Sequence, residues 1–173
     1  MMIMLKKQKN KINGFTFLEI LIAVSLIAIL SSIVYININP EGRFRESRNS
    51  QRDADIHELL QAITLYKSDN NNQLPQSITS LTRDLYYQIG TGSDCDDLCE
   101  NPIINLENTC LDLSFLSNNG YTTDIPIDPG NNGASALETR YFLSLSTEGL
   151  LTIGNCSEEA DINNITPQIQ ITK

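Results

Sequence analysis

The sequence predicts an α+β protein in which a long N-terminal helix packs on a small C-terminal antiparallel sheet. The helix is predicted by an almost continuous apolar segment at 15–38 and by apolar residues at helical spacing over 56–66. The sheet is predicted by two short apolar runs, 141–145 and 150–153, which flank a turn at Glu148-Gly149 as in a hairpin. A hydrophobic content of 40% excludes a wholly disordered chain.

The composition excludes several classes of function. The chain has 173 residues, with 21 Asp or Glu against 12 Lys or Arg, so its formal net charge is −9 and its length suits one domain. A direct nucleic-acid site is not expected, because binding to phosphates needs an excess of Lys and Arg. With a single histidine and no nucleophile elbow, phosphate loop or paired acid, the sequence does not predict an enzyme.

A basic leader and an apolar segment meet at Gly14. The leader carries four lysines and no acid, whereas residues 15–38 are almost wholly apolar. As a helix this segment would reach about 36 Å, enough to cross the roughly 30 Å hydrocarbon core of a membrane. Because lysines stay on the cytoplasmic side, we expect a single-pass protein of the cytoplasmic membrane. Its N-terminus would lie in the cytoplasm and the chain after Pro40 would be extracytoplasmic.

Glu19 is an acid near the start of this apolar segment, where an unpaired carboxylate is costly. No Lys or Arg lies within a helical turn of it on the apolar side. If the chain were cut after Gly14, Phe15 would gain a free α-amino group, which could pair with Glu19 of a neighbouring subunit. A secretory signal peptide would have a shorter apolar core and a small-residue cleavage site, and a plain membrane anchor leaves Glu19 unexplained.

The lysine-rich leader, Gly14, the run FTFLE at 15–19 and the apolar helix are similar to the type IV prepilin signal. Two further stretches, 53–75 and 120–131, resemble pilins close to the major pseudopilin of type II secretion. The resemblance implies that a prepilin peptidase cleaves after Gly14 and methylates Phe15, and that Glu19 acts in subunit assembly. It also implies the pilin fold.

On this resemblance, we expect the chain to be a structural subunit, or prepilin, of a type IV pilus-like helical filament. The expected partners are further copies of the chain, the prepilin peptidase, an assembly ATPase and an inner-membrane platform protein. Membrane lipid would surround the apolar helix before assembly, and the filament would lie at the cell surface or in the periplasm. Two alternatives stay open: a type II secretion pseudopilin that forms a short piston-like filament, and a singly anchored extracellular binding module.

Four segments follow from these observations. Residues 1–14 form the cytoplasmic leader, which is removed, and residues 15–38 form the transmembrane or filament-core helix. Residues 39–75 form the amphipathic half of the helix and its end. Residues 76–173 form the extracytoplasmic globular head, with a short helix and the C-terminal hairpin. Isoleucines over 162–171 would add an edge strand or belong to a loose tail.

Three stretches carry more local predictions. Pro40 and Gly42 predict that the helix loosens or kinks between 37 and 42. Over 41–55, four arginines at 43–52 interleave with four acids, which predicts a solvated helix face held by exposed ion pairs. Residues 81–89 predict a short helix or an irregular packed loop.

The four cysteines face an oxidising compartment if the membrane orientation holds, which favours disulfides. A zinc site is the alternative, since Cys95 and Cys99 have a suitable spacing, but no second close pair or histidine follows them. We favour a Cys95–Cys99 bond that closes a small loop. A Cys110–Cys156 bond would then join the middle of the head to the end of the hairpin.

No cofactor is expected, and calcium is a weak candidate. Asp94, Asp96 and Asp97 supply the hard oxygen ligands that calcium prefers, and Asp128 with the asparagines after it forms a second loose group. Neither stretch matches a defined calcium-binding loop. A solvated acidic loop is the simpler interpretation.

Overall fold

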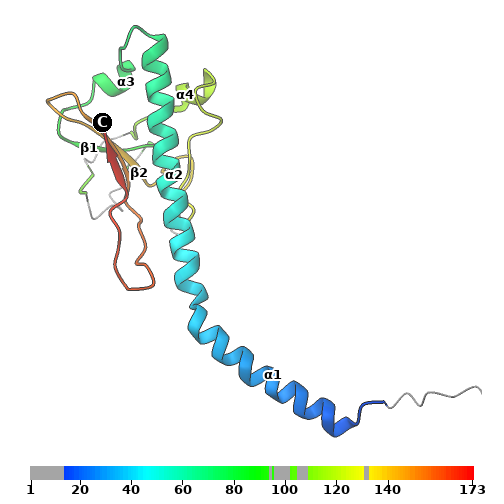
Figure 1. The fold of residues 1–173 in the computed structure, drawn as a ribbon. Coiled ribbons are helices and arrows are strands. Elements are labelled where there is room, and N and C mark those ends of the chain that lie inside the picture. The colour runs from blue at the N-terminus through cyan, green and yellow to red at the C-terminus, as the bar shows by residue number, and fades with distance from the viewer. Residues whose placement is uncertain (1–13, 94, 96–101, 105–108, 131–132) are drawn as a thin grey trace, which may run out of the picture. The chain divides into compact units, whose positions relative to one another are not determined.

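The structure, a computed structural model, describes residues 14–93, 95, 102–104, 109–130 and 133–173. The chain divides into two units, Met1–Pro40 and Glu41–Lys173 (Figure 1). The first unit contains one apolar helix. The second, called the head unit from here on, contains nearly all of a longer helix, two short helices and a four-stranded antiparallel sheet. The predicted α+β class is confirmed.

Helix α1 spans Phe17–Ile38. Thr16 caps its N-terminus, because this residue has extended backbone angles and its side-chain oxygen accepts a hydrogen bond from the Glu19 N–H at 3.2 Å. The helix ends at Asn39, whose φ of 44° is left-handed. Helix α2 then begins at Pro40, a residue well suited to the first position of a helix. The predicted interruption thus falls at Asn39.

Helix α2 spans Pro40–Asp69, and its C-terminal half carries the predicted apolar face. Ile56 and Ile63 are at most 1% exposed, because this face packs on the sheet. The helix stops in a run of asparagines. Asn72 is left-handed, with φ of 63°, and its N–H donates to the Lys67 carbonyl at 2.7 Å, so a free carbonyl of the last turn is satisfied.

The sheet has four antiparallel strands in chain order, so each strand pairs with the next. Ile153 lies opposite Leu143 on one side and opposite Ile171 on the other. The predicted hairpin is confirmed, and of the two alternatives for the tail the edge strand is the one that forms. The strands are β1 Tyr86–Gln88, β2 Tyr141–Leu145, β3 Leu151–Asn155 and β4 Gln170–Thr172.

Strand β2 is buried along its whole length because both of its faces are covered. On one face Leu143 belongs to the main core, which α2 closes. On the other face Phe142 packs with Ile104 in a smaller cluster, and its ring lies edge-on to the Tyr86 ring with the centroids 5.4 Å apart. The main core therefore lies between α2 and the sheet.

Residues 81–89 differ from the prediction of a short helix or an irregular loop, since they supply strand β1. A parallel bridge between Ile89 and Leu111 continues the sheet beyond β1. A strand of three residues has no periodicity to detect, and long-range pairing with β2 determines it. The two short helices are α3 Gln76–Thr79 and α4 Ser114–Asn118.

Candidate functional site

The bond between Gly14 and Phe15, predicted as the cleavage site, lies in a non-helical segment just before α1. Phe15 is 77% exposed. Apart from the chain neighbours of Gly14, no heavy atom lies within 4 Å of the position that a Cβ would take on it. Within the described part of the chain, nothing covers this bond. An accessible, non-helical peptide is the form that a peptidase can bind and cut.

Glu19 lies in the first turn of α1, where the partial positive charge of the helix N-terminus favours a carboxylate. Its backbone N–H is bonded to Thr16, and its side chain is exposed. Among the described residues, none forms an ion pair with its carboxylate. In an apolar environment this acid needs a partner from elsewhere, and its predicted role in assembly stays a prediction.

Helix α1 exposes apolar side chains all around its axis. Its segment Phe17–Tyr35 has a mean hydropathy of 2.6 and no buried residue, and by length and composition it is able to cross a membrane. The exposed fractions of its large apolar side chains run from 50% for Ile22 to 82% for Phe17. A helix that is apolar on every side needs lipid or other helices around it. The surface of Phe17–Tyr35 is therefore suited to contact with lipid or with other helices.

Residues 9–35 match a family model described as the prokaryotic N-terminal methylation motif. The motif, the exposed apolar helix and the α+β head unit define the class: a protein with a prepilin-type N-terminus and a pilin-like fold. The chain is 24% identical over 157 residues to "Type II secretion system core protein G" of Aeromonas hydrophila. The aligned region covers 91% of this chain and 94% of that protein. No solved structure matches the chain significantly. The resemblance to the superfamily of type IV pilins and type II secretion pseudopilins is thus confirmed.

A network of charged and polar side chains is buried in the head unit. The side chain of Arg52 is 1% exposed, and its Nε and Nη2 donate to the two carboxylate oxygens of Asp128 at 2.7 and 3.0 Å. Its Nη1 donates to Asn49 at 2.7 Å and to Glu159 at 3.0 Å. Asn155 donates a further hydrogen bond to Asp128 at 2.8 Å. The paired geometry and the added hydrogen bonds are what a buried ion pair needs to be stable.

The charge pattern predicted a solvated helix face for the arginines at 43–52, and this is wrong for Arg52. Arg52 lies four residues before Ile56, so it shares the face of α2 that packs on the sheet. That spacing is the signal in the sequence that identifies its burial. Arg43 follows the prediction, since its side chain is 64% exposed and it pairs with Glu46 at 3.0 Å.

The network lowers the pKa values of two acids. Burial opposes the ionisation of Asp128, but the hydrogen bonds from Arg52 and from neighbouring donors outweigh burial, so the pKa of Asp128 is lowered. The hydrogen bond from Arg48 lowers the pKa of Glu159. Both acids are therefore held in the charged form that the arginines bind.

Two other acids of the head unit are shifted in the opposite direction. Burial raises the pKa of Asp55, although its carboxylate accepts a hydrogen bond from the Tyr141 hydroxyl. Burial also raises the pKa of Tyr141, and the hydrogen bond to Asp55 adds to this shift. The pKa of Glu158 is raised by burial as well. These acids ionise at a cost in the folded state, and the charged form is favoured when the chain unfolds.

The opposing shifts predict how the stability of the head unit depends on pH. As the pH falls from about 7, protonation of Asp55 and Glu158 favours the folded state, so the free energy of unfolding holds or rises slightly. Asp128 and Glu159 stabilise the fold above their ordinary pKa values of 3.8 and 4.5, and this contribution is lost as the pH falls through their lower folded values. The free energy of unfolding, measured with urea, should therefore stay nearly level as the pH first falls and then drop steeply at acidic pH.

A matched variant tests the origin of that decline. Asp128→Asn cannot ionise at this position, so its stability at neutral pH should be lower and its loss below about pH 4 should be shallower than in the unaltered chain. An acid decline of the same steepness in both proteins would contradict the assignment to Asp128.

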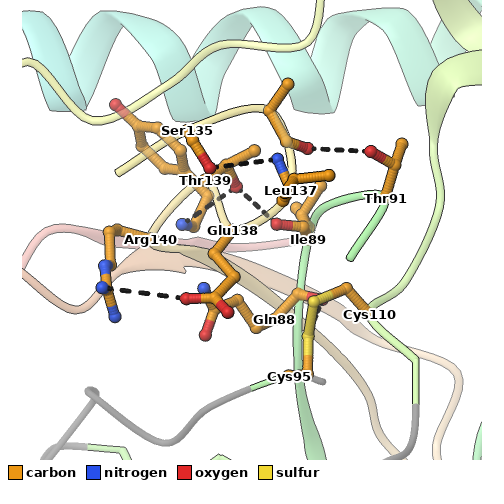
Figure 2. Close-up of a disulfide and its surroundings, with 12 residues drawn as sticks. Gln88, Ile89, Thr91, Cys95, Cys110, Ser135, Leu137, Glu138, Thr139 and Arg140 are labelled. Atoms are coloured by element: carbon orange, nitrogen blue, oxygen red, sulfur yellow. Dashed lines mark hydrogen bonds and ion pairs between the residues drawn. A yellow bond between two sulfur atoms is a disulfide. The ribbon is translucent and has the colours of Figure 1, made fainter. Parts of the chain in front are cut away.

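The predicted disulfide pairs are wrong (Figure 2). The structure bonds Cys95 to Cys110, with their Cα atoms 5.0 Å apart, so neither Cys95–Cys99 nor Cys110–Cys156 forms. Cys156 is disulfide-bonded too, and Cys99 lies outside the described residues. Because Cys95, Cys110 and Cys156 are all in disulfides, the alternative of a zinc site is not supported either.

Backbone pairing explains why Cys110 meets Cys95. The Leu111 N–H donates to the Gln88 carbonyl at 2.8 Å, and the Cys110 N–H donates to the Gly92 carbonyl at 3.2 Å. The segment at 110–111 therefore runs beside the end of β1, from which the chain leads directly to Cys95. The short spacing between Cys95 and Cys99 did not decide the pairing, because contacts far apart in sequence did.

Replacing both Cys95 and Cys110 by serine should lower the free energy of unfolding by about 3 kcal/mol. The bond closes a loop with a sequence separation of 15, and the loss of loop entropy in the unfolded chain is about this large. Denaturant unfolding under non-reducing conditions measures the change. Peptide mapping by mass spectrometry is the control, and a linked peptide pair containing Cys110 and Cys156 would contradict the pairing.

The calcium candidates divide into two sets. Asp94, Asp96 and Asp97 lie outside the described residues. Asp128 lies in the buried network, where both carboxylate oxygens accept hydrogen bonds from Arg52, so a calcium ion would have to replace the guanidinium. Within the described ranges, no group of three or more His, Cys, Asp or Glu side chains is placed to hold a metal ion. The geometry does not support calcium at Asp128.

Proposed function

We propose that the chain is a structural subunit of a type IV pilus-like helical filament. In this proposal residues 1–14 are a cytoplasmic leader, and a prepilin peptidase cleaves after Gly14 and methylates Phe15. Residues 15–38 first anchor the subunit in the cytoplasmic membrane and then form the filament core, with the globular part at 76–173 extracytoplasmic. The observation that carries the proposal is the wholly exposed apolar helix α1 behind an accessible peptide bond.

The subunit would place α1 in two apolar environments in succession, lipid before assembly and neighbouring α1 helices afterwards. Exchanging lipid for helices yields little net hydrophobic free energy, because lipid tails are as apolar as the side chains that they contact. Pairing of Glu19 with the Phe15 amine of an adjacent subunit then sets the register between helices more than it adds stability. The work of extraction comes from an assembly ATPase and a platform protein, which are separate proteins.

A second candidate function is that of a type II secretion pseudopilin in a short filament. The similarity to "Type II secretion system core protein G" over 91% of this chain favours it. Both functions share cleavage, methylation and helical assembly, and they differ in the filament that is built.

Mass spectrometry of the protein from the membrane fraction tests the shared part of the proposal. The mature chain should begin with N-methylated Phe15, and a chain that still begins with Met1 would contradict the proposal and favour a plain anchor. Shearing of intact cells separates the two filament types. Long surface fibres that contain the chain support the pilus, whereas a chain found only in short envelope-bound filaments supports the pseudopilus.

A further inference from the structure

The loop between β3 and β4 displays two isoleucines on an ordered turn at 161–165, called the loop tip from here on. Ile162 and Ile165 are 40% and 64% exposed. The Asp161 carboxylate accepts hydrogen bonds from the N–H groups of Asn163 and Ile165 at 2.8 and 2.9 Å, and the Asp161 N–H donates to the Ile165 carbonyl at 2.9 Å. These bonds hold the backbone of the loop tip, so the positions from which its two apolar side chains project are set.

The same loop is hydrogen-bonded to α2, at a point N-terminal to the apolar face of that helix. Asn49 Nδ2 donates to the Glu159 carbonyl at 2.7 Å, and the Glu159 N–H donates to Asn49 Oδ1 at 3.1 Å. Arg48 donates to both carboxylate oxygens of Glu159, at 2.6 and 2.5 Å. A loop that is ordered before it meets a partner loses less conformational entropy on binding. The loop tip is thus already ordered in the free subunit, which favours its binding to a partner.

A pocket of about 400 Å³ lies near the other end of α2, in the size range of binding pockets. Four apolar side chains and two lysines line it, together with the polar side chains of Thr64, Ser68 and Asn72 and the backbone of Gly149. Those lysines are half of the basic residues that follow residue 52, the others being Arg83 and Arg140. The pocket therefore offers an apolar lining and positive charge on an acidic head unit. The apolar and charged residues of the lining are Leu60, Ile63, Leu74, Leu151, Lys67 and Lys173.

The loop tip and the pocket lie toward opposite ends of the head unit. In Figure 1 the loop before β4 runs along α2, away from the end marked C, and Lys173 at that end lines the pocket. Glu159 at the base of the loop contacts Asn49, whereas Lys67 lines the pocket, and the helix between these two residues of α2 is about 27 Å long. A contact between opposite ends of identical molecules is heterologous, and its repetition builds a helical array.

We propose that the loop tip of one subunit docks into this pocket of a second copy of the chain. The two isoleucines meet the apolar lining, and the acidic Asp161 meets the two lysines, so both apolar surface and charge are complementary. This contact rests on the proposed filament function and adds to it a head-to-tail interface between head units.

Site-specific photo-cross-linking in the full-length chain tests the contact. A photoreactive amino acid at position 165, and separately at position 162, is illuminated in cells that assemble the filament. The expected product is a dimer of the chain whose cross-linked peptide comes from 60–74 or 149–151 of the second copy. A cross-link to another part of the chain or to a different protein, or no dimer in assembled filaments, overturns the proposal while the filament function stands.

A charge reversal with a matched control gives a second test. Lys67→Glu should reduce the chain released in sheared filaments about fivefold, the scale expected for one exposed charged contact. Arg83→Glu makes the same change of charge at an exposed site outside the pocket, and it should leave the yield unchanged. Equal losses in both variants overturn the docking site. Failure of the unaltered chain to enter any filament overturns the proposed function itself, and the docking proposal with it.

Discussion

Replacing Arg52 by methionine is expected to lower the free energy of unfolding of the head unit by about 3–5 kcal/mol. The substitution keeps an apolar stem but removes the guanidinium, which leaves the Asp128 carboxylate buried without its ion-pair partner. The side chain of Asp128 is 0% exposed, so water cannot take the place of the lost donors without rearrangement. Urea unfolding of the detergent-solubilised chain, followed by near-ultraviolet circular dichroism, measures the change.

Two further variants give this prediction its control. Arg43→Met removes an exposed ion pair with Glu46 on the same helix, and it should cost less than about 1 kcal/mol. The double variant Arg52→Met with Asp128→Leu removes both buried charges, and it should be more stable than Arg52→Met alone. An Arg52→Met protein as stable as the unaltered chain would show that the buried pair does not hold the fold.

Replacing Glu19 by alanine is expected to leave membrane insertion intact and to reduce incorporation into filaments by more than tenfold. An ammonium and a carboxylate about 4 Å apart attract by roughly 4 kcal/mol at an effective dielectric near 20, before desolvation is subtracted, and a tenfold change needs about 1.4 kcal/mol. The carboxylate has no ion-pair partner among the described residues of its own chain, so an external partner is what the substitution removes. The amount of the chain in sheared fibres, relative to that in membranes, is the measurement.

Glu41→Ala is the matched control for Glu19→Ala. Glu41 is an acid in the first turn of α2, outside α1, and its only described ion pair is a long one with Arg45 at 3.8 Å. Its loss should leave filament yield unchanged. N-terminal sequencing of both variants separates assembly from processing, because the mature chain should begin at Phe15 in each. Normal filaments from processed Glu19→Ala protein would refute the pairing.

The parts of the fold that the sequence predicted are those with a long local pattern. The apolar run of α1, the helical spacing around Ile56 in α2 and the hairpin of β2 and β3 each extend over enough residues for periodicity to identify them. The motif around Gly14 and Glu19 is also local, because its residues lie within a few positions of one another.

The parts that the sequence did not predict depend on partners far along the chain. Strand β1 has three residues and exists through its pairing with β2, more than fifty residues later. The disulfide of Cys95 depends on the bridge between Ile89 and Leu111. A charged side chain such as Arg52 is normally assigned to solvent. Its spacing from Ile56 indicates the buried face of α2, but the sequence does not show that Asp128 lies opposite as its partner.

The absence of any buried residue in Phe17–Tyr35 has a consequence for how such a chain diversifies. Among the described residues, the core of the head unit contains only side chains from beyond residue 40, so each segment has its own packing requirements. Sequence changes in α1 are then constrained by bilayer thickness and by the α1 helices of other copies. Sequence changes after residue 40 are constrained by the folding of the head unit. Swapping α1 for that of a distant relative should therefore leave the urea midpoint of the head unit where it was.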